Sequence, residues 1–201
     1  MTVFTIILCG VIGYLLGSVN SSVVVGKYIF HNDVREQGSK NAGLTNTLRV
    51  LGKKAALMVL AGDILKGVLA CLFGSLINPQ YGAVIGGLFA VLGHNWPLYF
   101  NFKGGKGVLT SATVIMMWDW KIGLISLALF ILVVFLTRYV SLGSMIAAVS
   151  LVVVSLIMDK GAFFIISGAI LAGLIIYRHK ANISRLLKGE ENKLNLKKSK
   201  E

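Results

Sequence analysis

The stretch IGLISLALFILVVFLTRYVSLGSMIAAVSLVVVSLIM (residues 122–158) decides the fold class, because it holds two long apolar runs separated by a single charged residue, Arg138. Apolar runs approaching ~20 residues are typical of helices that cross a bilayer. Similar runs recur along the chain, and we predict about seven spans. Several are shorter than a full perpendicular span, so we expect some broken or tilted helices. The approximate ranges are 3–25, 55–77, 81–100, 108–118, 122–137, 140–158 and 162–177.

Composition supports a membrane protein. Of the 201 residues, 56% are hydrophobic and only 14% are charged, whereas a soluble domain carries about 25% charged residues. The mean hydropathy is strongly positive. Glycine, alanine and serine recur within the runs and should allow close helix packing. The sequence therefore predicts an all-α integral membrane protein, a compact bundle that forms a single domain over residues 1–201.

The distribution of lysine and arginine predicts the orientation. No positive charge precedes the first run, so it does not resemble a secretory signal, and we expect the N-terminus outside. With seven spans, 17 Lys and Arg residues fall on the cytoplasmic side and 2 outside, but the split becomes 10 against 9 if run 108–118 does not cross. Seven spans place the C-terminus and the polar segments 26–54, 101–107 and 178–201 in the cytoplasm. The end of the tail, KLNLKKSKE, is expected to be disordered.

The net charge of +12 raises the possibility of nucleic-acid binding. Topology and attraction to anionic lipid headgroups explain this charge better, so we expect membrane lipids as partners and no nucleic acid. The sequence indicates no obligatory protein partner. The three histidines and the few inner-face carboxylates lack metal-ligand spacing.

The first polar segment contains DVREQGSKNAGLTNTLRVLGKK (33–54), which is rich in small hydrogen-bonding side chains. They are Ser39, Asn41, Thr45 and Asn46. Gly38 and Gly43 permit tight turns that expose backbone N–H groups to anions, and Arg49 adds a planar guanidinium suited to phosphate. An ordinary polar loop with topology-setting charges explains the composition equally well.

The second polar segment contains FKGGKGV (102–108), in which Gly104, Gly105 and Gly107 surround Lys106 at the start of an expected helix. This arrangement suits phosphate, although it is not a P-loop. A re-entrant turn with a snorkelling lysine is the alternative.

The third segment, YRHKANISRLLKGEE (177–191), leaves the last run. His179 and Asn182 are three residues apart and share a helix face. His179 can act as a general base or simply as a hydrogen-bonding group. A basic helix that binds anionic lipid at the membrane surface is the alternative.

Two polar features lie within the apolar runs. Asp63 and Lys66 are ionisable residues in an apolar run, where charge is costly. We expect them to pair with each other or with the first loop, in a structural rather than a catalytic role. His94 and Asn95, near the inner end of the third run, either orient the second loop or satisfy a polar helix end.

Taken together, GSKNAGLTN with Arg49, FKGGKG and YRHKANISRLLKGEE resemble the three motifs of the bacterial acyl-phosphate:glycerol-3-phosphate acyltransferase family. The resemblance extends, in order, to GSVN (17–20), DILKG (63–67), LGHNWP (92–97) and RYVSLGS (138–144). Three positions depart from the family pattern. Lys40 stands where glycine is common, Leu44 where alanine is common, and Asn20 where proline is frequent. Lys40 can alter the phosphate pocket.

The resemblance implies a multi-pass enzyme of the bacterial cell (inner or plasma) membrane, with its motifs gathered at the cytoplasmic face. It implies transfer of an acyl group from acyl phosphate to the 1-hydroxyl of glycerol 3-phosphate, without a cofactor. The products are lysophosphatidic acid and phosphate, in the first acylation of phospholipid synthesis. The implied catalytic residues are Ser39, Arg49, Lys106, His179 and Asn182. The implied substrate-binding residues are Asn41, Gly43, Thr45, Asn46, Gly104, Gly105, Gly107 and Glu191.

The residue chemistry agrees with this reaction. An acyl phosphate is already an activated anhydride, so positioning and charge stabilisation can suffice without a covalent nucleophile. The chain lacks a G-x-S-x-G elbow and any H-x4-D pattern. The resemblance implies that the substrate's own phosphate helps to remove the hydroxyl proton. The rival functions are a small transporter of phosphorylated metabolites and a purely structural membrane-assembly protein.

Overall fold

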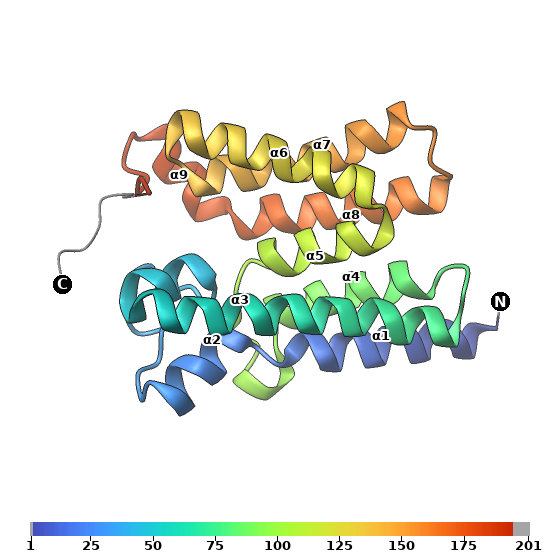
Figure 1. Cartoon of the computed structure of the whole chain (residues 1–201), viewed down its shortest axis with the longest axis horizontal. Helices are drawn as coiled ribbons and strands as arrows, with labels where there is room; N and C mark the ends of the chain where they lie inside the picture. The colour runs from blue at the N-terminus through green and yellow to red at the C-terminus, as the bar shows by residue number, and fades with distance from the viewer. Residues whose placement is uncertain (1, 195–201) are drawn as a thin grey trace. The chain divides into compact units, whose positions relative to one another are not determined.

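The computed structural model describes residues 2–194, and these residues form helices with no strand among them (Figure 1). The chain divides into two compact units, Met1–Trp120 and Lys121–Glu201. The predicted disorder of the KLNLKKSKE tail concerns mainly residues 195–201, which lie outside the described part.

The helix bounds follow the apolar runs closely in the second half of the chain. The first unit contains α1 (Val3–Ser18), α2 (Ser21–Val24), the π-helical turn η1 (Val25–Ile29), α3 (Leu44–Ile77), α4 (Gly82–Asn95), the 3-10 turn η2 (Leu98–Phe100) and α5 (Val108–Trp118). The unit boundary falls at the start of α6 (Trp120–Thr137), and the second unit continues with α7 (Val140–Ile157), α8 (Ala162–Arg178) and α9 (Lys180–Leu187).

The helices confirm an all-α, multi-pass membrane protein. Within residues 2–194, five helical segments are long and apolar enough to cross a bilayer, and α8 with α9 adds a sixth if that pair, bent by 58°, counts as one span. The remaining apolar helix, α5, has 11 residues, which rise only about 16 Å against a hydrocarbon core of about 30 Å.

The first predicted run, 3–25, is a broken helix. The chain becomes extended at Val19 and Asn20, and the Asn20 side chain caps α2 by accepting the Val23 N–H (3.1 Å). A break inside a membrane helix frees backbone groups that need other partners. The Val19 carbonyl finds one in the Lys66 ammonium at 3.2 Å.

The helix that contains the second predicted run, 55–77, begins eleven residues earlier than predicted. It is α3, which starts at Leu44, so residues 44–54 are not an open loop. The helix is interrupted only at Gly52, where φ is +79° and ψ is −171°. The early start is stabilised by packing, because Leu44 and Leu51 cover the buried cluster Val25, Ala55 and Val59.

The third predicted run, 81–100, also ends earlier as a helix. Helix α4 stops at Asn95, two residues before Pro97. Proline cannot donate a backbone hydrogen bond and disfavours helical geometry in the residue before it, so the chain continues as the short turn η2.

Small residues let the helices of the first unit approach closely, as predicted. Figure 1 shows α1, α3 and α4 running side by side. A methyl group built on Gly13 would overlap the backbone of Gly86, where α1 meets α4, and one on Gly74 would overlap Gly82, where α3 meets α4. Such contacts are typical of membrane helix pairs, which gain stability from close packing.

Candidate active site

Asn46 organises the loop that carries Ser39. Its side-chain oxygen accepts the Ser39 N–H (2.8 Å), and its amide nitrogen donates to the carbonyls of Val34 (2.8 Å) and Gln37 (3.1 Å). Gly38 has a φ of +58° and packs so tightly on this amide that a Cβ would overlap it. Ser39 is thereby exposed at a fixed position. That Asn46 also contacts substrate stays a prediction.

Lys40 adopts a backbone conformation that favours glycine. Its φ is +57°, in the left-handed region where a Cβ costs roughly 1–2 kcal/mol. This conformation gives a physical reason for the glycine that is common here in the family motif. The lysine side chain is exposed, so its departure from the pattern adds a cation next to Ser39.

We expect Lys40→Gly to stabilise the protein by up to about 1 kcal/mol, because glycine reaches this φ without strain. The matched control is Lys54→Gly, the same exchange at an exposed position within α3, which should destabilise by about 0.5–1 kcal/mol. Thermal unfolding of the purified proteins compares the two. Destabilisation by both exchanges would show that Lys40 is not strained.

The N-terminus of α3 has no side-chain cap. Gly43 precedes the helix, and its carbonyl accepts the N–H groups of Asn46 (3.1 Å) and Thr47 (3.0 Å). Thr45 and Arg49 are exposed on the first two turns. An uncapped helix N-terminus with a nearby guanidinium is suited to binding an anion.

The glycine loop, residues 101–107, packs against the end of α4. The Gly105 N–H donates to the His94 carbonyl (3.1 Å). A Cβ on Gly104 would overlap that same carbonyl, and a Cβ on Gly105 would overlap both the His94 Nε2 and the Ala42 carbonyl. The glycines are therefore needed for close packing. Lys106, half buried, follows directly.

Helix α5 begins immediately after this loop. Gly107 has a φ of +71° and provides no side-chain cap. Its missing Cβ would lie 2.8 Å from Oδ1 of Asn95. Asn95 is fully buried, and its side-chain amide has no hydrogen-bond partner in the described part of the chain. The uncapped N-terminus of α5 therefore lies next to the buried side-chain amide of Asn95.

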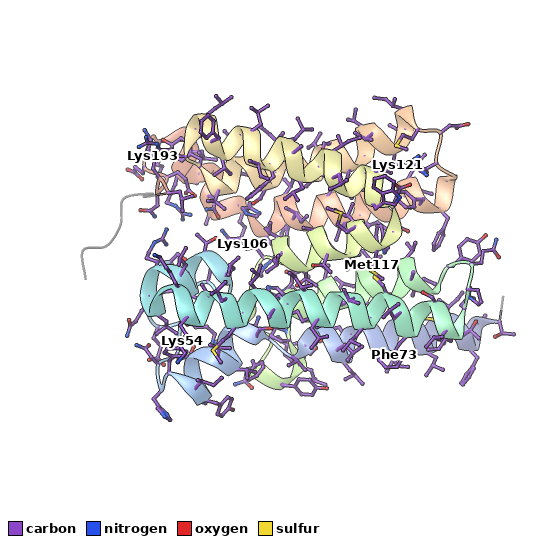
Figure 2. All side chains as sticks on the ribbon, in the orientation of Figure 1. Lys54, Phe73, Lys106, Met117, Lys121 and Lys193 are labelled. Atoms are coloured by element: carbon purple, nitrogen blue, oxygen red, sulfur yellow. The ribbon has the colours of Figure 1, made fainter. Side chains whose placement is uncertain are left out.

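The first and second motifs are neighbours within the first unit. Ala42 contacts Gly105, and Arg35 donates to the Phe100 carbonyl (3.3 Å). Arg35 is itself held by Asp33 (2.7 Å), and this hydrogen bond keeps the pKa of the Asp33 carboxyl below its ordinary value. Figure 2 shows Lys106 and Lys54 toward the same end of this unit.

A buried ionic cluster packs against the glycine loop through His94. The predicted pairing of Asp63 with Lys66 is confirmed at 2.8 Å. Lys66 also lies 2.8 Å from Nδ1 of His94, and Thr110 Oγ1 lies 3.4 Å from the same nitrogen. All four residues are buried. His94 therefore belongs to this buried cluster in addition to lying in the last turn of α4.

The third motif lies in the second unit and bends the chain by 58° at His179, between α8 and α9. Nδ1 of His179 lies 2.8 Å from the Ile175 carbonyl. A carbonyl only accepts hydrogen bonds, so Nδ1 bears the proton and Nε2 carries the lone pair in the neutral ring. This geometry suits Nε2 for accepting a proton.

Glu191 joins the other parts of the third motif. Its carboxylate accepts hydrogen bonds from Asn182 (2.6 Å), Ser141 (2.7 Å) and Arg185 (2.7 Å). Burial opposes ionisation, but these three donors outweigh it and hold the pKa of Glu191 below its ordinary value. Ser141 was not among the predicted site residues; only its place in the RYVSLGS string pointed to it.

The predicted site residues thus form two groups. The first unit holds Ser39, Asn41, Gly43, Thr45, Asn46, Arg49, Gly104, Gly105, Lys106 and Gly107, and the second holds His179, Asn182 and Glu191. Over the described residues, no group of three His, Cys, Asp or Glu side chains is placed to hold a metal ion.

Sequence comparison identifies the family. The profile of the glycerol-3-phosphate acyltransferase family matches residues 7–189. The glycerol-3-phosphate acyltransferase of Thermoanaerobacter sp. (strain X514) is 46% identical over 95% of this chain and 96% of its own. That of Clostridioides difficile (strain 630) is 44% identical over 98% of this chain and 100% of its own.

Structure comparison agrees. PlsY, an integral membrane glycerol 3-phosphate acyltransferase, matches in its glycerol 3-phosphate form with a TM-score of 0.89 and 34% identity, over 94% of this chain and 96% of that one. Its lysophosphatidic acid form matches with a TM-score of 0.85 and 33% identity, over 94% and 95% of the two chains. The chain therefore belongs to the glycerol-3-phosphate acyltransferase family, as a membrane-embedded acyltransferase, and a transporter is not favoured.

Proposed function

We propose that the protein transfers an acyl group from acyl phosphate to the 1-hydroxyl of glycerol 3-phosphate at the cytoplasmic face of the bacterial cell membrane. The products are 1-acyl-glycerol 3-phosphate and inorganic phosphate. The observation that carries this proposal is the contact between the first motif and the glycine loop at Gly105. It makes neighbours of two uncapped helix N-termini, and both substrates bear phosphate groups that such termini stabilise.

In this proposal, Lys106 and the glycine loop bind the phosphate of glycerol 3-phosphate. The buried amide of Asn95 supports this assignment, because it lies beside Gly107 without a partner among the described residues. Arg49 and the exposed Ser39 hold the phosphate of the acyl donor, since a guanidinium forms paired hydrogen bonds with phosphate oxygens. His179, Asn182 and Glu191 contribute to the same reaction.

The chemical step needs no covalent enzyme intermediate. The acceptor hydroxyl oxygen attacks the carbonyl carbon, the bond from that carbon to the phosphate oxygen breaks, and phosphate leaves with the electron pair. The hydroxyl proton passes to the leaving phosphate, so atoms and charge balance. The lone pair on Nε2 of His179 offers the other route for the proton, and His179→Ala separates the two. Normal binding of both substrates with no turnover would assign the base to His179.

For the topology, we propose one domain with seven crossings, the N-terminus outside and the C-terminus in the cytoplasm. The charge distribution supports α5 as the short fourth crossing, because only then do 17 of the Lys and Arg residues share one side. The motif segments then all face the compartment that supplies water-soluble glycerol 3-phosphate.

Phosphate release by the purified protein in lipid tests the function. The reactions contain palmitoyl phosphate with glycerol 3-phosphate, palmitoyl-CoA with glycerol 3-phosphate, or palmitoyl phosphate alone. We expect phosphate release and lysophosphatidic acid only in the first. Folded protein that turns over no acyl phosphate of any chain length contradicts the proposal, and uptake of phosphorylated metabolites into vesicles would then favour the transporter.

A further inference from the structure

In the buried cluster next to the glycine loop, one lysine makes an ion pair and two hydrogen bonds. Nζ of Lys66 lies 2.8 Å from the Asp63 carboxylate, 3.2 Å from the Val19 carbonyl and 2.8 Å from Nδ1 of His94. A lysine ammonium has N–H donors and no acceptor, and here it forms an ion pair with Asp63 and hydrogen bonds with the Val19 carbonyl and Nδ1 of His94. A charged group is costly inside a membrane protein unless it is paired, and here the ion pair and the two hydrogen bonds offset the cost of burying the ammonium.

This arrangement fixes the protonation of His94. Because the Lys66 ammonium can only donate hydrogen bonds, Nδ1 of His94, at 2.8 Å from it, must act as the acceptor. The ring is then neutral and carries its proton on Nε2. A protonated ring would add a positive charge to a buried pair that is already neutral, which is unfavourable. The Asp63 carboxylate oxygen lies 3.7 Å from Nδ1 of His94.

The other side of the His94 ring faces the glycine loop. Nε2 lies against Gly105, so closely that a Cβ there would overlap it. The His94 backbone carbonyl accepts the Gly105 N–H at 3.1 Å and lies against Gly104. One residue thus contacts the loop through both its ring and its backbone, while its Nδ1 is held by Lys66.

We propose that His94 is a positioning residue for the phosphate-binding loop, held in one tautomer and one orientation by the Asp63–Lys66 pair. The proposal rests on the function proposed above, in which this loop binds glycerol 3-phosphate. A loop that is fixed before binding loses less entropy when the substrate arrives. His94 therefore lowers the KM for glycerol 3-phosphate and leaves the acyl donor largely unaffected.

Two substitutions of His94 distinguish the contribution of its Nδ1, which contacts Lys66, from that of its Nε2, which contacts Gly105. His94→Asn places an amide oxygen near the position of Nδ1, so Lys66 keeps its acceptor, but the side chain no longer reaches Gly105. His94→Gln places an amide nitrogen near the position of Nε2, so the contact with the loop remains, but Lys66 loses an acceptor. The first variant tests positioning, and the second tests the structural contribution of the cluster.

We expect His94→Asn to raise the KM for glycerol 3-phosphate by about tenfold, with smaller changes in kcat and in the KM for acyl phosphate. Hydrogen exchange of residues 101–107 should become faster, while the thermal midpoint falls little. His94→Gln should show the opposite pattern, a KM near that of the wild type with a lowered thermal midpoint. Nitrogen NMR of the three-histidine protein should show Nε2 of His94 protonated and Nδ1 unprotonated.

A His94→Asn protein with unchanged KM and unchanged exchange of residues 101–107 overturns the proposal, as does a protonated Nδ1 in the wild type. Lys106→Met distinguishes failure of the underlying assignment. If Lys106→Met leaves the KM for glycerol 3-phosphate unchanged while His94→Asn still accelerates exchange in the loop, His94 positions the loop and the loop's proposed ligand is wrong.

Discussion

Replacing Lys106 with methionine is expected to lower kcat/KM for glycerol 3-phosphate by about 10²- to 10³-fold, because it removes the one cation of the glycine loop that lies next to the start of α5. Methionine keeps the length and apolar character of the side chain, so the half-buried stem of Lys106 still has its packing volume. The measurement is steady-state phosphate release with glycerol 3-phosphate varied at saturating acyl phosphate.

The matched control for this prediction is Lys103→Met. Lys103 is exposed in the same loop, three residues earlier, and its backbone N–H donates to the Phe100 carbonyl. This variant loses the same formal charge and should keep kcat/KM within about twofold, because exposed charges are largely screened. Equal losses in both variants would mean that general attraction of phosphate, and not a specific contact from Lys106, explains the effect.

Hydropathy predicted the parts of the fold in which apolar character and helix coincide. The run 108–118 matches α5 residue for residue, and 140–158 exceeds α7 by one residue. Hydropathy could not predict the start of α3, because residues 44–54 are mostly polar and their helix is stabilised by the packing of Leu44 and Leu51 on a cluster that includes Val25, from an earlier helical turn. The break at Val19 was not predicted either, because the long apolar run 3–25 as a whole outweighs the short polar stretch of Ser18, Asn20, Ser21 and Ser22 around it.

The site was predictable where the sequence places partners close together. Asp63 and Lys66 are three residues apart, so their pairing follows from helix geometry alone and is confirmed at 2.8 Å. The arrival of His94 at the same lysine depends on how α3 packs against α4, which local spacing does not specify. Ser141 was missed for a related reason, because its partner Glu191 lies 50 residues away in sequence.

The positive φ of Lys40 shows what a departure from a family pattern can mean. The resemblance to the family motif indicated only that glycine is common at this position, and it led to the prediction that Lys40 can alter the phosphate pocket. The structure adds a backbone reason, a φ of +57°, which is independent of any ligand. Charge and strain are therefore separate consequences of the same residue, and only the strain can be read from the fold.

The Asp63–Lys66 pair provides the largest expected effect on stability. Lys66→Met leaves the Asp63 carboxylate, the Val19 carbonyl and Nδ1 of His94 without their common donor. Breaking a buried ion pair from one side costs about 3–5 kcal/mol, so we expect a steep loss of thermal stability. The measurement is the fraction of monodisperse protein that remains after heating in detergent.

The double variant Asp63→Asn with Lys66→Met separates the cost of an unpaired charge from the loss of packing. It removes the isolated carboxylate, and buried ion pairs replaced as a whole are often nearly neutral, so most of the lost stability should return. Lys54→Met, at an exposed position of the same helix, should have almost no effect. If the double variant were no more stable than Lys66→Met, the Val19 carbonyl and His94 would be the partners that matter. In that case, Lys66 would contribute more than Asp63 to stabilising the break between α1 and α2.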